Sequence, residues 1–338
     1  MKYFINHGIP HRIYSALFPI LLVALALTGC STPPKNEGLS ATGFYFDTVI
    51  TLQVWGTNDE EILNHCMKLC SQYEQKLSRT IEGSDIWNIN HAQGNPVTVS
   101  DETIQVLEAG LSYSQLSEGR FDITIAPLSI LWDIDNNPGT IPEQSAIEEA
   151  RSHVNYQTVQ ISGNTVTLTD PNAAIDLGGI AKGYIADQLK AYLKVQGIEH
   201  AWISLGGNVV TIGTKIDGSP FRIGIQKPFA EENTAITTLE VTDQSVVSSG
   251  IYERYFEKDG KIYHHILDPA TGYPCETDLY GVTILSRNSV DGDGYSTICL
   301  SLGLEEGLKF INQQDGIEAI FITSDYKLHY SDGLKDLN

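Results

Sequence analysis

Several short motifs that mark common enzyme classes are missing from this sequence of 338 residues. It contains no Gly-x-Ser-x-Gly, His-Glu-x-x-His or Cys-x-x-Cys segment. Assignments as a serine hydrolase, a zinc peptidase or a thioredoxin-like protein therefore have no support.

Basic residues are scarce, with 21 Lys and Arg against 42 Asp and Glu, a formal net charge of −21. Residues 1–29 hold two basic and no acidic side chains, so their removal would leave 19 basic against 42 acidic, a net charge of −23. Such a surface repels nucleic acid and anionic lipid, so nucleic acid is not expected as a partner. Any Lys or Arg placed to meet a phosphate stands out.

Cysteine is also rare, and only Cys66, Cys70, Cys275 and Cys299 follow Cys30. Cys66 and Cys70 are four residues apart in a segment with a helical pattern, which places both on one helix face. Core packing is favoured over a metal site there, because His65 points elsewhere and no other ligand is near. Whether any disulfide forms is left open.

The N-terminus carries a targeting pattern. Lys2 and Arg12 precede an apolar stretch over 14–27 that is short for a membrane span, and Leu27-Thr28-Gly29-Cys30 follows as a lipobox. We expect a lipoprotein signal peptide over 1–29 and a lipidated Cys30, with an ordinary secretory signal as the alternative. Residues 30–40 are expected to form a flexible tether, and 41–338 a single folded domain.

Strand and helix patterns mix along the rest of the chain without regular βαβ alternation. This predicts an α+β fold with mixed, largely antiparallel sheets and flanking helices rather than a Rossmann fold. The loop over 119–132 is expected to lead into an apolar segment interrupted by Pro127. Strands are predicted over 44–55, 159–168 (a hairpin), 174–177, 201–205, 209–213, 221–226, 237–241, 246–249, 262–267, 281–285 and 317–330 (a pair). Helices are predicted over 59–77, 101–117, 142–153, 180–195, 292–302 and 305–313.

Two glycine pairs follow predicted strands. Gly178-Gly179 leads into a helix whose first turn holds Lys182, so backbone N–H groups and one cation could receive a phosphate. A plain turn is the alternative for this pair. Ser204-Leu205-Gly206-Gly207-Asn208 is the second case, and a simple hairpin bend explains it equally well.

Polar side chains cluster in two further segments. His264 and His265 lie in a strand pattern that sends them to opposite faces, so one of them could act as a general base at a given site. A surface or core-edge position is the alternative for either histidine. Asp293 and Thr297, four residues apart in a helical segment, could share a hard cation, although Asp293 could instead be a helix N-cap.

Taken together, these segments resemble the ApbE family, the FAD:protein FMN transferases. The resemblance follows the order of the chain: FDTVITL, LSRTIEGSDIWNIN, EGRFDITIAPL, IDLGGIAKGYIAD, ISLGGNV, SSGIYERYF, YHHILDPATGYP and DGDGYST. It covers nearly all of 41–338, and the ordered combination is highly specific.

The resemblance implies roles for particular residues. His265 would be the catalytic histidine, and Mg²⁺ would be held by the Gly179 carbonyl with Asp293, Ser296 and Thr297. FAD, as the substrate, would contact Phe46, Thr80, Arg120, Phe121, Asp122, Asp176, Lys182 and Ile266. Two departures stand out: Phe46-Asp47-Thr48 replaces a commoner Met-Gly-Thr, and Thr80 stands where many members carry an aromatic ring.

The expected activity is Mg²⁺-dependent transfer of FMN from FAD to a Ser or Thr hydroxyl, with release of AMP. Family members imply extracytoplasmic flavoproteins of electron-transfer chains as acceptors, and Cys30 implies the extracytoplasmic face of a bacterial cell membrane. Because Thr80 lacks the ring, an FAD pyrophosphatase is the alternative enzyme. A non-catalytic flavin-binding lipoprotein is the alternative outside the enzymes.

Overall fold

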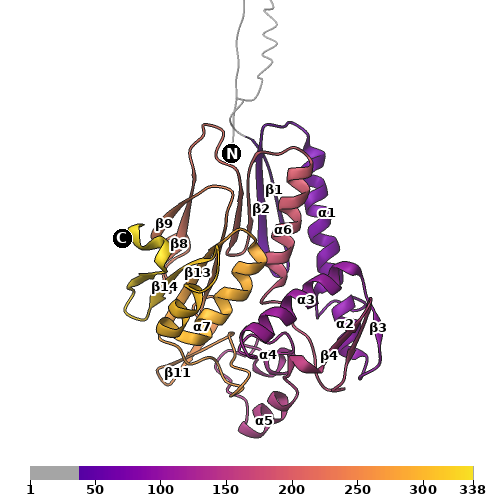
Figure 1. The fold of residues 1–338 in the computed structure, drawn as a ribbon. Coiled ribbons are helices and arrows are strands. Elements are labelled where there is room, and N and C mark those ends of the chain that lie inside the picture. The colour runs from indigo at the N-terminus through magenta and orange to yellow at the C-terminus, as the bar shows by residue number, and fades with distance from the viewer. Residues whose placement is uncertain (1–37, 338) are drawn as a thin grey trace, which may run out of the picture. The chain divides into compact units, whose positions relative to one another are not determined.

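An eight-stranded antiparallel sheet in the order β1-β2-β6-β7-β10-β13-β14-β15 is the centre of the computed structural model, which describes residues 38–337 (Figure 1). The predicted signal peptide, Cys30 and most of the predicted tether lie outside the described residues. The strands are β1 (Leu39–Tyr45), β2 (Thr48–Trp55), β6 (His200–Leu205), β7 (Asn208–Ile212), β10 (Ser245–Gly250), β13 (Leu279–Ser286), β14 (Glu318–Thr323) and β15 (Leu328–Tyr330).

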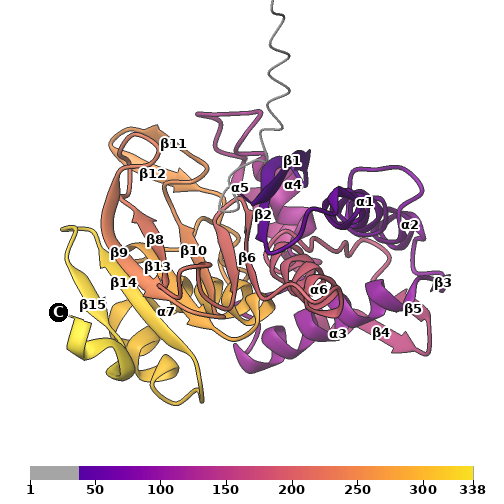
Figure 2. The ribbon, with the colours of Figure 1, turned by 90° about the horizontal axis from the view of Figure 1, so that it is seen from above.

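Helices cover one face of this sheet and a hairpin covers part of the other. α1 (Glu60–Leu77) and α6 (Ala181–Val195) bury their apolar faces on β2, β6 and β7, and α7 (Ser289–Ile311) packs on β10, β13 and β14. The hairpin of β8 (Phe221–Gln226) and β9 (Ala235–Val241) packs on the opposite side, against Val246, Leu285 and Ile320 (Figure 2). Cys66 and Cys70 are free thiols, fully buried on the core-facing side of α1, and the predicted core packing is confirmed.

The remaining elements gather beyond one end of the large sheet, at the bottom of Figure 1. A three-stranded sheet and the hairpin β11–β12 lie among short helices there. These elements are α2 (Asp85–His91), β3 (Val97–Thr98), α3 (Asp101–Leu116), α4 (Ala126–Trp132), α5 (Gln144–Ser152), the 3₁₀ helix η1 (Tyr156–Thr158), β4 (Val159–Ser162), β5 (Thr165–Leu168), β11 (Tyr255–Lys258) and β12 (Lys261–His264); a second 3₁₀ helix, η2 (Asp332–Leu337), ends the described chain.

The α+β class with largely antiparallel sheets is confirmed, but four local predictions were wrong. The strand expected over 44–55 is the hairpin β1–β2, because Phe46 and Asp47 adopt positive φ of 53° and 56° and reverse the chain. Pro127 does not interrupt a segment but lies in the first turn of α4, where its missing N–H costs nothing. Residues 174–177 form only an isolated bridge from Ala174 to Ile125, and β12 ends at His264 rather than at 267.

The helices expected over 292–302 and 305–313 are confirmed as the two parts of α7, which breaks between them at Gly303 with φ 76° and ψ −176°. The short helix α2 has no counterpart among the predicted elements. Among the described residues, no helix combines the length and apolar character that a bilayer crossing requires.

Strand register brings two chain reversals to the same end of the sheet. Ile50 near the start of β2 pairs with Leu205 at the end of β6, so the β1–β2 turn lies beside the Gly206-Gly207 turn. A side chain on Gly206, which has φ 48°, would collide with Thr48 Oγ1. The two turns therefore pack tightly together and support the residues that follow them.

Candidate functional site

A cleft with a cavity volume of about 230 Å³ brings together residues from most of the predicted motifs. Ten of the residues implied by the family resemblance line it: Arg120, Phe121, Asp122, Asp176, Gly179, Lys182, His265, Ile266, Asp293 and Thr297. Segments as distant in sequence as 120–122 and 293–297 thus share one concave surface, as expected for a ligand site.

Three of the implied residues do not line the cleft. Ser296 is fully buried behind it, where its Oγ lies 2.8 Å from Ser249 Oγ and 3.1 Å from the Asp293 carbonyl oxygen. Phe46 lies in the β1–β2 turn and donates its backbone N–H to Glu74 Oε1. Thr80 is exposed, and its Oγ1 lies 3.0 Å from Ser78 Oγ.

Asp293 is the buried carboxylate of the site, only 3% exposed, although it lines the cleft. Its Oδ2 accepts the Gly183 N–H of α6 at 2.6 Å, and its Oδ1 accepts the Asn208 Nδ2–H of β7 at 2.8 Å. Burial raises the pKa of this carboxyl, while Lys182 and the two hydrogen bonds act in the opposite direction. Two helices and the sheet therefore meet at one acidic side chain.

Gly183 is required for the close contact between α6 and α7. A Cβ at this position would collide with the Ser289 carbonyl oxygen and the backbone of Val290, so only glycine lets α6 approach α7 this closely. On the same side, both carboxylate oxygens of Asp187 accept backbone N–H groups of α7, from Ser289 at 2.7 Å and from Val290 at 2.9 Å. α7 has no side-chain cap of its own, so Asp187 caps it from α6.

The oxygen donors around Asp293 suit a hard divalent cation. Asp293 and Thr297 both line the cleft from the first turns of α7, and Gly179 lines it from the start of α6. Within residues 38–337 no cluster of three or more His, Cys, Asp or Glu residues could hold a metal. Mg²⁺, however, is commonly bound by one or two carboxylates and completed by phosphate oxygens and water, and this donor set fits that pattern.

The N-terminus of α6 supplies positive charge to the same cleft. Gly178, Gly179 and Lys182 line it. A 15-residue helix with a lysine in its first turn favours an anion at that position, and the Gly183 N–H of that turn is already bound by Asp293. The glycine pair therefore lies on the cleft surface, where a phosphate could approach its backbone.

Asp176 is engaged within the protein, and this reveals a cation that the sequence did not single out. Its Oδ1 accepts the Gly178 N–H at 2.8 Å. Its Oδ2 accepts Arg79 Nε and Ser129 Oγ, each at 3.0 Å. Arg79 lines the cleft, whereas the neighbouring Thr80 does not. Asp176 therefore holds the Arg79 side chain at the cleft surface.

Asp122 is engaged in a similar way. Its carboxylate accepts the Thr124 N–H at 2.8 Å, Thr124 Oγ1 at 2.7 Å and the Tyr156 N–H at 2.9 Å. These bonds shape the loop that presents Arg120 and Phe121 to the cleft. The Phe121 ring packs close to Gly179, so the loop that carries Phe121 contacts the turn that precedes α6.

The two histidines have different surroundings, although His265 lies just beyond the end of β12. His264 is buried, and its Nε2 lies 3.1 Å from the Cys275 carbonyl oxygen. His265 faces the cleft, and its Nδ1 lies 3.2 Å from the Arg254 carbonyl oxygen. A carbonyl can only accept, so Nδ1 carries the proton and Nε2 keeps its lone pair. Burial, with the positive charge of Arg254, lowers the pKa of His265 to about 3.

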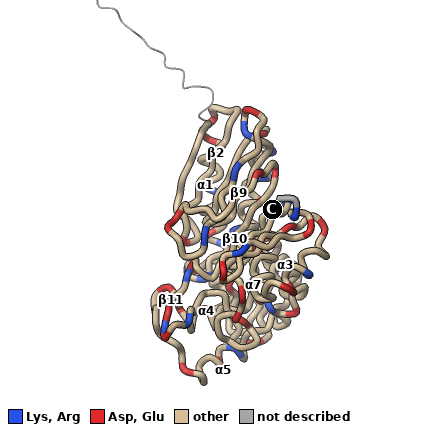
Figure 3. Tube along the Cα trace, turned by 90° about the vertical axis from the view of Figure 1, so that its left-hand side faces the viewer, with Lys and Arg blue, Asp and Glu red and all other residues tan. Residues whose placement is uncertain are grey.

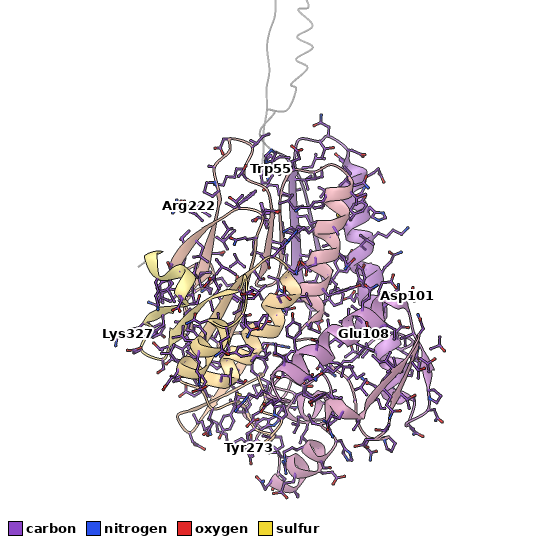
Figure 4. The ribbon with its side chains drawn as sticks, viewed as in Figure 1. Trp55, Asp101, Glu108, Arg222, Tyr273 and Lys327 are labelled. Atoms are coloured by element: carbon purple, nitrogen blue, oxygen red, sulfur yellow. The ribbon has the colours of Figure 1, made fainter. Side chains whose placement is uncertain are left out.

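Aromatic packing fixes the wall opposite the sheet. Trp132 of α4 lines the cleft, and its Nε1 donates to the Gly272 carbonyl oxygen at 2.8 Å. Tyr273, seen near α5 in Figure 4, packs edge-on against Trp132 and donates its hydroxyl to Gln144 Oε1 at 2.6 Å. Arg254 and Asp135, also on the cleft surface, approach to 3.3 Å, in a region where basic and acidic positions lie close together around β11 and α4 (Figure 3).

Comparison with known proteins places this arrangement in a family. A sequence model of the ApbE family matches residues 46–321. The chain is 40% identical over 291 residues to the FAD:protein FMN transferase of Klebsiella pneumoniae strain 342, covering 85% of this chain and 90% of that protein. It is 32% identical over 290 residues to the FAD:protein FMN transferase of Treponema pallidum strain Nichols, covering 81% and 80%.

Solved structures share the fold. The ApbE protein of Thermotoga maritima superposes with a TM-score of 0.80 at 29% identity, over 88% of this chain and 98% of that one. The flavin transferase ApbE of Vibrio cholerae gives the same TM-score at 27% identity, over 89% and 99%. The sequence match, the shared fold and the ordered motifs in one cleft agree, and this chain belongs to the ApbE family.

Proposed function

We propose that this chain is an FAD:protein FMN transferase, which uses Mg²⁺ to move FMN from FAD to a Ser or Thr hydroxyl of an extracytoplasmic protein and releases AMP. The relatives named above as FAD:protein FMN transferases support the flavin transfer. The observation that carries the proposal is the cleft itself, where the free Nε2 of His265 shares one cavity with Lys182, Asp293 and Thr297.

The chemistry follows from what these groups can do. The hydroxyl oxygen attacks the phosphorus of the FMN half, the bond from that phosphorus to the bridging oxygen breaks, and AMP leaves with this oxygen. His265 Nε2 receives the hydroxyl proton, since its lone pair is free and the imidazole is neutral. Lys182 and the positive end of the α6 dipole stabilise negative charge that builds on the phosphate oxygens.

Asp293, Thr297 and the Gly179 carbonyl would hold Mg²⁺. When bound there, the cation supplies charge neutralisation at the pyrophosphate. The protein's own contribution is to keep the Asp293 carboxylate ionised and aimed, through Gly183 and Asn208. Lipidation at Cys30 would place the reaction on the extracytoplasmic face of the membrane, where acceptor flavoproteins of electron-transfer chains would be within reach.

An FAD pyrophosphatase is the second candidate, and one observation favours it. Thr80 is exposed, does not line the cleft and offers no ring to cover a bound flavin. Water would then compete more easily with a protein hydroxyl for the same phosphorus.

A single assay separates the candidates. The protein is incubated with FAD, Mg²⁺ and a candidate acceptor, and flavin fluorescence is followed on the acceptor band while AMP and free FMN are measured. Transfer predicts a fluorescent acceptor with matching AMP, whereas hydrolysis predicts free FMN. His265→Ala should abolish either reaction while Mg²⁺ and FAD still bind. If AMP never accumulates with any acceptor, the chain is a flavin-binding protein and the proposal is wrong.

A further inference from the structure

Asn208 is a buried amide that packing alone does not explain. It is 1% exposed, and its Nδ2 donates to Asp293 Oδ1 at 2.8 Å and, at the longer distance of 3.5 Å, to Ser289 Oγ, while its own Oδ1 has no hydrogen-bond partner among the described residues. An unpaired buried carbonyl costs free energy, so an apolar residue of similar size would suit a purely structural position better. The donor group must therefore serve a purpose that offsets the unpaired oxygen.

The orientation of the amide is fixed by charge. Turning it over would place its oxygen against the Asp293 carboxylate at 2.8 Å, which is repulsive. The backbone of Asn208 is equally fixed, because it pairs with Leu205 of β6 on one side and with Val247 of β10 on the other. The N–H donor is thus held rigidly toward one carboxylate oxygen.

The turn before Asn208 helps to position its side chain. Gly206 and Gly207 have φ of 48° and 93°, values that side chains rarely tolerate. Thr48 packs directly against Gly206, so the segment with Phe46-Asp47-Thr48 supports the turn from behind. The segment around residues 46–48 therefore supports the turn over 204–208, which places Asn208 beside Asp293.

We propose that Asn208 is a positioning residue for the metal site, which holds the Asp293 carboxylate in the orientation that faces the cleft. This rests on the proposed Mg²⁺-dependent function. Together with the Gly183 N–H, the amide occupies one side of each carboxylate oxygen. Outer hydrogen bonds of this kind orient a metal ligand without touching the metal.

The test measures Mg²⁺ binding by calorimetry on the purified full chain, with Mg²⁺ alone and with Mg²⁺ plus ADP as a pyrophosphate without the flavin. Asn208→Leu keeps the volume and removes the donor, and Asn208→Ser is a smaller variant that is also too short to reach Asp293. Both should raise the Mg²⁺ dissociation constant by about 10- to 100-fold, the usual effect of losing an outer hydrogen bond to a ligand.

Thr211→Val is the matched control on the same strand. Thr211 is fully buried, its Oγ1 donates to the Gln244 carbonyl oxygen at 3.0 Å, and it does not line the cleft. It should lower the melting temperature and leave the Mg²⁺ dissociation constant unchanged. Wild-type Mg²⁺ affinity in both Asn208 variants overturns the inference alone. A wild-type chain that binds no Mg²⁺, with or without ADP, overturns the metal site and this inference together.

Discussion

His265 shows how surroundings select one protonation state of a single residue. Its backbone N–H and its Nδ1 both lie within hydrogen-bond distance of the Arg254 carbonyl oxygen, at 3.1 and 3.2 Å. Burial and the positive side chain of Arg254 then lower its pKa to about 3. The free enzyme therefore presents a neutral imidazole with an available Nε2 over the whole physiological range.

This predicts an unusual pH dependence. A histidine with a lowered pKa stays neutral until the pH falls to that value, so the His265 limb of kcat/KM should lie well below the ordinary value of about 6.5. In the kcat profile the limb should move upward, because the bound pyrophosphate stabilises the imidazolium. Profiles over about pH 4 to 8 would check this, and a kcat/KM limb near 6.5 would contradict it.

Arg79 gives a second prediction at this scale. Its Nε is held by Asp176, and no hydrogen bond to the rest of the described chain holds its terminal nitrogens, which leaves them for a ligand. Arg79→Ala should lower kcat/KM for FAD by about tenfold, less than a fully buried charged hydrogen bond gives, because the side chain is 32% exposed. Arg79→Lys should rescue little, since lysine lacks the Nε that Asp176 orients. Steady-state kinetics at saturating Mg²⁺ would show this, and wild-type kcat/KM in Arg79→Ala would exclude the contact.

At the scale of elements, the sequence predicted helix ends that residues next to them in the chain determine. α1 and α3 begin at the acidic positions that the sequence marks, with Asp59 and Ser100 as their caps. The wrong predictions concern segments whose conformation depends on residues that are distant in the sequence. The β1–β2 turn has neither Gly nor Pro, so no local residue type marks the positive φ of Phe46 and Asp47.

The candidate site divides in the same way. Asp293 and Thr297 could be paired from sequence because a helix sets their spacing. Arg79 and Asn208 could not, because their partners lie 97 and 85 residues away along the chain. Such contacts are fixed by strand order and by the crossing of α6 and α7, which no local pattern contains.

The third prediction concerns the contact between α6 and the start of α7. Asp187 caps α7 from α6, and burial raises its pKa to about 6. Its folded-state pKa exceeds the unfolded value of about 4, so the folded chain binds the extra proton, and stability from this group is lost as the pH rises between those values. The unfolding free energy of wild type should fall relative to Asp187→Asn over about pH 4 to 6. Urea denaturation at several pH values measures this, and a constant difference between the two proteins would refute it.

At the scale of the whole molecule, charge is distributed unevenly. On the face shown in Figure 3, acidic positions occur along most elements. Arg79, Arg120, Lys182 and Arg254 line the cleft together with five aspartates. The four basic side chains offer a pyrophosphate charge partners in the cleft, while the acidic surface elsewhere repels anionic membranes. The chain's own charge therefore offers no means of holding an anionic bilayer.

Membrane attachment should consequently depend on Cys30, which is the fourth prediction. Without residues 1–29 the chain carries a net charge of −23, and no helix within 38–337 could cross a bilayer. In a bacterial host the chain should incorporate a labelled fatty acid, stay with the membrane in high salt, and have a mature N-terminus at Cys30 by mass spectrometry. Cys30→Ser should abolish labelling and leave the precursor uncleaved, whereas Cys66→Ser, in the core, should not affect labelling. A chain of residues 31–338 should stay soluble and keep its flavin activity; labelling of Cys30→Ser would show that the anchor lies elsewhere.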